Sequence, residues 1–312
     1  MNKVQKINFE NFEWVNIIDP TEKEMNDLRV AHDFHPLDLA DCLAASHRSK
    51  VDVYPEYTFV VFIFPSYNRT TREIESTEIN FFISNNYLIT VHHGTLDVFN
   101  EYFNLFTLSP DLRKKYADRS PEKLLYEVLN KIFLYILPII DHVSDDSDNI
   151  ERAIFTGRER KMISEILVIR RNITDLRKIM QVHKNVLKKA ILNFKESPLF
   201  VMKKTDVYFE SLLDYTKEIW DTLENLKERI EALQQTNESQ ISFRLADIMR
   251  ILTIISVVMF PVSLLAAIFG MNTNQSMPFV DSPYGFWYVI GIMVVIVMIM
   301  LAIFRKKDWI SK

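Results

Sequence analysis

Two long apolar runs near the C-terminal end stand apart from the rest of the chain. The first, residues 251–269, contains no charged residue, and the second covers residues 286–304. An α-helix rises about 1.5 Å per residue, so each run is long enough to cross most of a hydrocarbon core of about 30 Å. Gly270 follows the first run and allows the backbone to leave the helix. The pattern predicts two transmembrane helices joined by a short loop.

A long amphipathic helix is predicted immediately before the first apolar run. From about residue 206, apolar positions recur at steps of three and four, which is the spacing of one helix face. They are Leu212, Tyr215, Ile219, Thr222, Leu226, Ile230 and Leu233. No proline interrupts residues 206–260, so a helix that continues to Phe269 would be about 95 Å long. A helix of that length needs packing partners.

The first 95 residues alternate between strand and helix patterns. Thr21 followed by Glu24 resembles a capping box and opens a helix that ends near His32. A second short helix is expected at 36–45, and strands at 12–18, 50–53, 58–65, 72–83 and 87–92. The segment TFVVFIF at 58–64 is apolar almost throughout, which indicates a strand covered on both faces. Helices then follow at 97–108, 121–155 and 158–194. The sequence therefore predicts a mixed α/β domain followed by helices.

Composition and charge narrow the function. The chain has 312 residues, a net charge of -4, one cysteine and five glycines. A negative net charge without a basic stripe argues against nucleic-acid binding. Cys42 is expected to be a small buried residue, and the soluble part is expected to lie in a reducing compartment. The sequence shows no glycine-rich phosphate loop, nucleophile elbow or zinc-protease motif, so neither an enzyme nor an organic cofactor is predicted.

Basic residues flank the two apolar runs on one side only. Arg244 and Arg250 precede the first run, and Arg305, Lys306 and Lys307 follow the second, whereas the loop at 271–285 has no lysine or arginine. The positive-inside rule places both termini in the cytosol and the loop outside. The N-terminus has no apolar signal segment. We expect a multi-pass protein of the cell membrane.

One face of the first apolar run carries polar and small side chains. At steps of three and four along that face lie Met249, Leu252, Ser256, Phe260, Ser263 and Ala267. Close packing against another helix explains small residues, because they let membrane helices approach. A pore lining is the alternative, and it would require several chains, since two helices cannot enclose a water-filled path.

Acidic and histidine residues suggest weaker hypotheses. Asp141, Asp145 and Asp148 share a helix face, and Glu210 lies one turn before Asp214. Such pairs are ordinary on a solvated helix, but they can also attract divalent cations. The seven histidines do not form a convincing metal set. In the loop, Asn272, Asn274, Gln275 and Asp281 supply oxygens that suit a hydrated Mg²⁺.

Several segments together resemble the CorA family of magnesium and cobalt transport proteins. Gly270-Met271-Asn272 at the end of the penultimate membrane helix carries most of the resemblance. Further matches are FHPLDLADCL near the start, YFESLLDYT at 208–216, and MRILTII with Phe260-Pro261 in the first span. The resemblance covers nearly the whole chain.

The resemblance implies a funnel-shaped homopentamer in the bilayer, with the first span of each chain lining the pore. It implies that Gly270, Met271 and Asn272 form the outer selectivity ring, and that Met249 and Leu252 form a cytosolic constriction. Ser256, Phe260 and Ser263 would line the path between them. It also implies that intracellular Mg²⁺ binds between cytosolic domains and closes the pore.

This chain departs from the family pattern at three places. Phe269 stands where a tyrosine is usual, and Met277-Pro278 is followed by Phe279 where many relatives have a glutamate. Ser211 stands at the position of a sensing acid, so Glu210 and Asp214 are the candidates that remain nearby.

The expected fold is an α/β cytosolic domain, a long stalk helix and two C-terminal transmembrane helices. The predicted boundaries are 1–120 for the α/β domain, 121–205 for a helical hairpin, 206–250 for the stalk, 251–269 and 286–304 for the spans, 270–285 for the outer loop and 305–312 for a basic tail. The predicted function is Mg²⁺ uptake down its electrochemical gradient, with Co²⁺ or Ni²⁺ as further ions. The alternatives are a zinc transporter of the same superfamily, which Met271 disfavours, and a non-conducting membrane-anchored scaffold.

Overall fold

The computed structural model describes residues 3–44, 48–94, 96–115, 120–200, 206–271, 278–279, 282–307 and 309. The chain divides into two compact units, Met1–Gln235 and Thr236–Lys312. Helix α8 (Asp206–Phe269) contributes its first part to one unit and its second part to the other.

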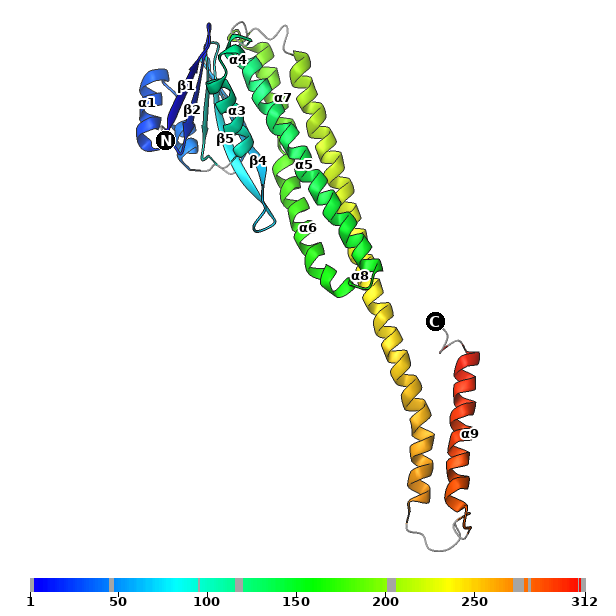
Figure 1. Cartoon of the computed structure of the whole chain (residues 1–312). Coiled ribbons are helices and arrows are strands. Elements are labelled where there is room, and N and C mark those ends of the chain that lie inside the picture. The colour runs from blue at the N-terminus through cyan, green and yellow to red at the C-terminus, as the bar shows by residue number, and fades with distance from the viewer. Residues whose placement is uncertain are drawn as a thin grey trace. The chain divides into compact units, whose positions relative to one another are not determined.

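A six-stranded mixed sheet forms the centre of the first unit (Figure 1). The strands lie in the order β1-β2-β6-β5-β4-β3. Strands β2 and β6 run parallel, and the other neighbouring pairs are antiparallel. The bounds are β1 (Val4–Asn8), β2 (Glu13–Ile18), β3 (Lys50–Val53), β4 (Thr58–Asn68), β5 (Glu73–Ile83) and β6 (Tyr87–His92).

The predicted strands are confirmed with two differences. The hydrophobic pattern gives no signal for β1, because this edge strand buries little besides Ile7. Strand β4 is longer than predicted, since it pairs with β5 as far as Asn68 and Glu73, whereas β5 agrees with its prediction to within one residue. Asn68 closes that hairpin by accepting hydrogen bonds from the backbone N–H groups of Thr70 and Thr71.

Two short helices cover one face of the sheet. They are α1 (Glu22–His32) and α2 (Pro36–Leu43), and their buried residues include Met25, Leu28 and Leu39. The predicted capping box is confirmed, because the Thr21 N–H donates to the Glu24 carboxylate at 2.9 Å. Cys42 is buried in this core, as expected.

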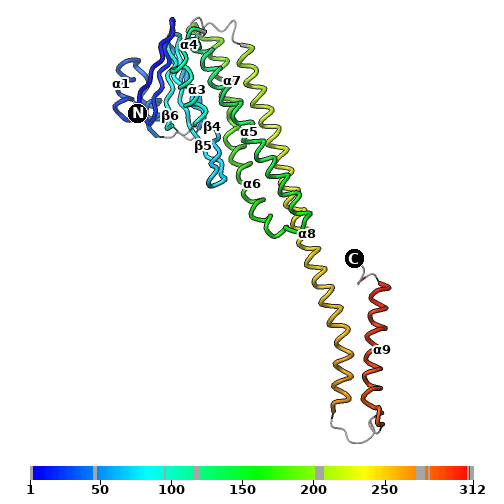
Figure 2. The backbone as a smooth tube through the Cα atoms, viewed as in Figure 1, coloured from blue at the N-terminus to red at the C-terminus, as the bar shows by residue number. Residues whose placement is uncertain are grey.

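The other face packs against the remaining helices of the first unit. They are α3 (Asp97–Leu108), α4 (Pro110–Lys115), α5 (Pro121–Phe155), α6 (Glu159–Met180), α7 (His183–Glu196) and the first part of α8. Figure 2 shows α5, α6, α7 and α8 running side by side. The prediction of one continuous helix over 158–194 is wrong, because the chain turns at Gln181 and Val182 between α6 and α7. After this turn α7 packs along β3 and β4, and its Asn193 amide donates to Thr58 Oγ1 of β4 at 2.6 Å.

The buried stripe of α8 has a regular seven-residue spacing. It consists of Phe209, Leu212, Thr216, Ile219, Leu223, Leu226, Ile230, Leu233 and Asn237. The predicted stripe contains Tyr215 and Thr222 instead of Thr216 and Leu223. Both are only half-buried, since a strict alternation of three and four residues keeps one seam against the neighbouring helices.

The apolar core of the first unit continues from the sheet through α5, α6 and α7 to α8. The predicted boundaries at 120, 205 and 250 therefore stay predictions.

Candidate ion pathway along α8

The second unit contains the two helices that meet the criteria for a membrane span. They are the C-terminal part of α8 and α9 (Gly285–Lys306). The most apolar stretches of these helices have mean hydropathies of 2.6 and 2.8, and none of their residues is buried inside the protein. Figure 1 shows α9 beside the end of α8. The two predicted spans at 251–269 and 286–304 lie within these helices.

The predicted pore-lining residues share one uncovered face of α8. Met249, Leu252 and Phe260 are exposed, and the exposed fraction of Phe260 is 72%. Ser256 and Ser263 are exposed as well.

The opposite face of α8 is the one covered by α9. Its half-buried residues are Ile254, Val258, Pro261, Val262, Leu265 and Phe269. On α9 the half-buried positions are Val289, Met293, Ile296, Val297, Met300 and Phe304. At about 100° per residue, the centre of the α9-facing set on α8 lies about half a turn from the polar face. The polar face is therefore not the contact between the two spans of one chain.

Hydroxyl groups on and beside this face bond to the helix backbone. Ser256 Oγ donates to the Leu252 carbonyl at 2.9 Å, and Thr253 Oγ1 donates to the Met249 carbonyl at 2.7 Å. A hydroxyl that donates its proton to the backbone presents acceptor lone pairs to its surroundings. Such oxygens suit the water shell of a cation.

The Gly-Met-Asn segment begins where α8 ends. The Gly270 N–H donates to the Ala266 carbonyl at 2.9 Å, and the Met271 N–H donates to the Ile268 carbonyl at 3.3 Å. Gly270 keeps a negative φ, so the helix ends without the left-handed glycine that the sequence suggests. Met271 is exposed. Asn272, Asn274, Gln275, Met277 and Asp281 lie outside the described residues.

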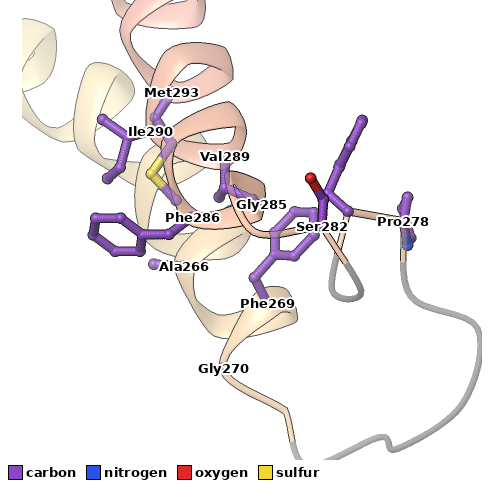
Figure 3. A pocket seen from close by; sticks show the side chains of 11 residues that line it. Ala266, Phe269, Gly270, Pro278, Ser282, Gly285, Phe286, Val289, Ile290 and Met293 are labelled. Atoms are coloured by element: carbon purple, nitrogen blue, oxygen red, sulfur yellow. The ribbon is translucent and has the colours of Figure 1, made fainter.

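An apolar cleft of about 450 Å³ lies between the ends of the two spans (Figure 3). It is lined by Ala266, Phe269, Gly270, Pro278, Phe279, Ser282, Gly285, Phe286, Val289, Ile290 and Met293. Gly285 lies so close to the Phe279 carbonyl that a Cβ there would be 2.0 Å from the oxygen. Its place directly before the second apolar run was the sequence signal that could have indicated this contact. Among the described residues that line the cleft, none carries a charge that could bind a metal.

The predicted regulatory acids lie on α8 within the first unit. Glu210 and Asp214 are exposed, one turn apart, and point away from the buried stripe. Among the residues that the structure describes, no three histidine, cysteine or acidic side chains are grouped closely enough to hold a metal. The proposed sensing role of this pair therefore needs ligands from elsewhere.

The acidic run on α5 is largely engaged in ion pairs. Asp148 and Glu151 both pair with Arg229 of α8, the latter at 2.6 Å. Asp146 lies 3.5 Å from Arg72, which also pairs with Glu165 of α6. Asp141 and Asp145 are exposed. These contacts favour a structural role for Asp148 and tie α5 to α8.

Two histidines are buried structural groups, as the isolated-histidine interpretation expects. His92 Nε2 lies 3.1 Å from Asn16 Oδ1, and His183 Nε2 lies 2.7 Å from the Ile63 carbonyl. Burial lowers the pKa of each to about 4, so both are neutral at neutral pH.

Comparison with known proteins adds to this geometry. The family model described as CorA-like Mg²⁺ transporter protein matches residues 9–306. The chain belongs to the CorA family. The match includes strands β2 to β6, the long helix and both spans.

CorA relatives and a CorA structure cover the chain almost completely. It is 28% identical to the cobalt/magnesium transport protein CorA of Thermotoga maritima over 300 residues, which is 95% of this chain and 83% of the relative. It is 26% identical to the protein of the same name from Methanocaldococcus jannaschii over 310 residues, 99% of this chain and 95% of the relative. The complete structure of the CorA magnesium transporter from Methanocaldococcus jannaschii superposes with a TM-score of 0.81 at 25% identity, covering 97% of this chain and 93% of that one.

Proposed function

We propose that this protein carries Mg²⁺, and Co²⁺ as a second ion, across the cell membrane. The relatives that match most of the chain are magnesium or cobalt/magnesium transport proteins by name. The observation in this chain that supports the proposal most directly is the polar face of α8 with Ser256 and Ser263, which lies on the side opposite α9. Neither span of the same chain covers Ser256 or Ser263, so that face is available to line a path.

A homopentamer supplies the missing walls of that path. Two spans cannot enclose water, whereas five copies of α8 around an axis can. Met249 and Leu252 then form an apolar constriction at one end, and Phe260 a second ring nearer the other. Gly270, Met271 and Asn272 lie at the outer mouth, with both chain termini in the cytosol, in keeping with the basic residues that flank the spans.

The selectivity of the outer mouth rests on weak contacts with a hydrated ion. Mg²⁺ gives up its water reluctantly. A ring of Asn272 amide oxygens accepts hydrogen bonds from the ion's waters and still lets the ion leave. Intracellular Mg²⁺ bound between cytosolic domains closes the pore, with Glu210 and Asp214 as ligands in that regulation.

Flux into liposomes tests this function. The purified chain is reconstituted, an inside-negative potential is imposed, and uptake of Mg²⁺, Co²⁺, Ni²⁺ and Zn²⁺ is followed with internal indicators. Mg²⁺ uptake that depends on the protein is expected. Uptake of Zn²⁺ without Mg²⁺ would favour the zinc transporter, and no uptake of any ion would favour a scaffold.

Two variants with a matched control test the path itself. Ser256→Leu replaces a polar group on the uncovered face and should lower Mg²⁺ flux by about tenfold or more, about 1.4 kcal/mol on the barrier. Val295→Leu enlarges an exposed apolar side chain of α9 on the side away from α8 and should leave flux unchanged. Equal flux in Ser256→Leu and wild type would contradict the assignment of this face.

Asn272→Ala tests the selectivity ring. Removing several hydrogen bonds, each worth roughly 1 kcal/mol, should weaken ion capture by orders of magnitude while assembly survives. If Asn272 only caps the helix, the variant should lose stability and keep its ion choice. Wild-type Mg²⁺ uptake by a correctly assembled variant would exclude the selectivity role.

A further inference from the structure

One corner of the sheet is left open because β3 is short. Strand β3 pairs with β4 only from Val53↔Thr58 to Lys50↔Val61. Ile63 lies beyond this pairing, so its outward backbone groups have no strand partner there. The Ile63 N–H instead donates to Ser49 Oγ at 3.1 Å, and its carbonyl lies 2.7 Å from His183 Nε2. These two bonds hold the segment before β3 and the α6–α7 turn against the same residue.

A cleft of about 450 Å³ occupies this corner. Its lining residues are Arg48, Ser49, Ile63, Ile74, Ser76, Asp175, Lys178, Ile179 and Val182. The volume lies within the range of about 300–1,000 Å³ that is typical of small-molecule sites. Its three isoleucines supply an apolar surface, and charged and hydroxyl groups come from three different parts of the chain. This composition of apolar surface with a few convergent polar groups is typical of a ligand site.

Lys178 differs from the preceding residue, Arg177, in having no ion pair with a described residue. Arg177, the preceding residue, pairs with Glu224 of α8. Lys178 has no ion pair with any residue that the structure describes, and it lines the cleft together with Arg48. Two cationic side chains from separate segments therefore border one concave surface, and Asp175 is the one acid among its described lining residues.

Two hydroxyl groups complete the polar lining. Ser49 accepts the Ile63 N–H, which leaves its own proton available for donation. Ser76 is exposed on β5 and lines the same cleft. Cations and hydroxyl donors together are the groups that recognise phosphate oxygens.

We propose that this cleft binds a phosphate-bearing small molecule of nucleotide size. Lys178 and Arg48 pair with the phosphate oxygens, and Ser49 and Ser76 donate hydrogen bonds to them. The isoleucine surface packs against a flat ring, and Asp175 accepts a hydrogen bond from an N–H or O–H group of the ligand. This site lies in the α/β unit and does not depend on the proposed ion path.

Binding to the purified full-length chain in detergent tests the proposal. Adenosine, AMP, ATP and inorganic phosphate are titrated by calorimetry, with EDTA present because nucleotides chelate Mg²⁺. AMP or ATP should bind and adenosine should not. Lys178→Glu reverses the charge at the cleft and should weaken binding by about tenfold or more. Lys161→Glu, on the exposed side of the same helix, should not change it.

The remaining variant and outcomes decide between specific and general effects. Ser76→Asp places a carboxylate in the cleft at an exposed position and should also abolish binding. Phosphate binding as tight as that of AMP would contradict a ligand of nucleotide size, because the isoleucine surface would then contribute nothing to binding. Equal losses in Lys178→Glu and Lys161→Glu, equal binding of adenosine and AMP, or no binding of any probe would overturn the proposal.

Discussion

His183 is enclosed by aromatic rings at the junction of α6 and α7. The rings of Phe62, Phe64 and Phe133 lie 5.5, 5.4 and 5.8 Å from the imidazole, centroid to centroid. With Nε2 at the Ile63 carbonyl, Nδ1 has no hydrogen-bond partner among the described residues. A second proton would place a charge in this apolar surrounding, which is why burial lowers the pKa to about 4.

The stability of the protein should therefore fall with acidification. The unfolded chain binds a proton with the ordinary pKa of 6.5, whereas the folded chain does so only at about 4. The contribution of the neutral His183 to the unfolding free energy is fully present above pH 6.5. It is lost as the pH falls towards 4, which lowers the unfolding free energy by about 3 kcal/mol. Thermal unfolding in detergent across this pH range should show the decline, and His183→Gln should reduce its slope.

His92 provides the reference for that comparison. Its pKa is also lowered to about 4 by burial, so it supplies a similar slope in both proteins. An identical pH slope in wild type and His183→Gln would contradict the prediction.

Gly285 and Gly291 are two glycines of α9 with opposite surroundings. A Cβ at Gly285 would lie 2.0 Å from the Phe279 carbonyl oxygen, whereas a Cβ at Gly291 meets no atom within 4 Å. Gly285→Ala should destabilise the protein by about 1–3 kcal/mol, because the backbone of the loop must move. Gly291→Ala should be neutral or stabilising by up to about 1 kcal/mol. Melting temperatures of the two variants test this, and equal values would refute the close contact.

At the scale of the helix, α8 combines two different surfaces. Its first part packs the buried stripe with seven-residue spacing into the bundle. Its second part is apolar nearly all round, as in a membrane span. Side-chain charges reinforce the first part. Arg229 connects it to α5, and Arg177 of α6 pairs with Glu224 and lies 5.4 Å from the Trp220 ring.

The register of the α8 seam can be tested by two neighbouring substitutions. Leu223 is fully buried, so Leu223→Ala should cost about 2–5 kcal/mol. Thr222 is half-buried, and its hydroxyl donates to the Glu218 carbonyl of its own helix at 2.9 Å. Thr222→Ala should therefore change stability by less than about 0.5 kcal/mol. Thermal unfolding of both variants measures the difference, and a larger effect at Thr222 would support the other stripe.

At the scale of the whole molecule, the uncovered apolar surface of the spans exceeds what two helices need for each other. Leu252, Phe260 and Leu264 on α8 are all more than half exposed in the single chain. Lipid covers part of such a surface, and neighbouring copies arranged around a water-filled path cover another part. An assembly of several chains meets this requirement, and the proposed pentamer is such an assembly.

We predict that the assembly responds to Mg²⁺ through acids on its cytosolic part. Mass measurement under mild detergent conditions should give a homo-oligomer, most simply five chains. Millimolar-range Mg²⁺, as expected for weak carboxylate sites, should protect the α/β unit against protease. Glu210→Gln combined with Asp214→Asn should weaken that protection.

A matched pair of acids on α5 serves as the control for this regulation. Asp141→Asn with Asp145→Asn removes two exposed carboxylates of the same kind and should leave the protection intact. Unchanged protection in the Glu210/Asp214 variant would exclude these ligands. A stable monomer would contradict the channel itself.

The amino-acid sequence alone determined the elements whose signal is local. The two spans follow from uninterrupted apolar runs, the start of α1 from Thr21 and Glu24, and the length of α8 from the absence of proline before Pro261. The Gly-Met-Asn segment indicated the family without any fold. Each of these signals is carried by neighbours in the chain, so no distant contact is needed to recognise them.

Only the tertiary structure decided which surfaces face each other. On α8 both Thr222 and Leu223 fit a helical stripe, and only the position of the bundle makes Leu223 the buried one. Within the spans nearly every face is apolar, so hydrophobicity could not show that Phe269 faces α9 while Phe260 does not. The cleft beside Lys178 joins segments more than a hundred residues apart, from Arg48 to Val182. Such contacts depend on how strands end and helices turn, and composition or periodicity in one segment contains no information about them.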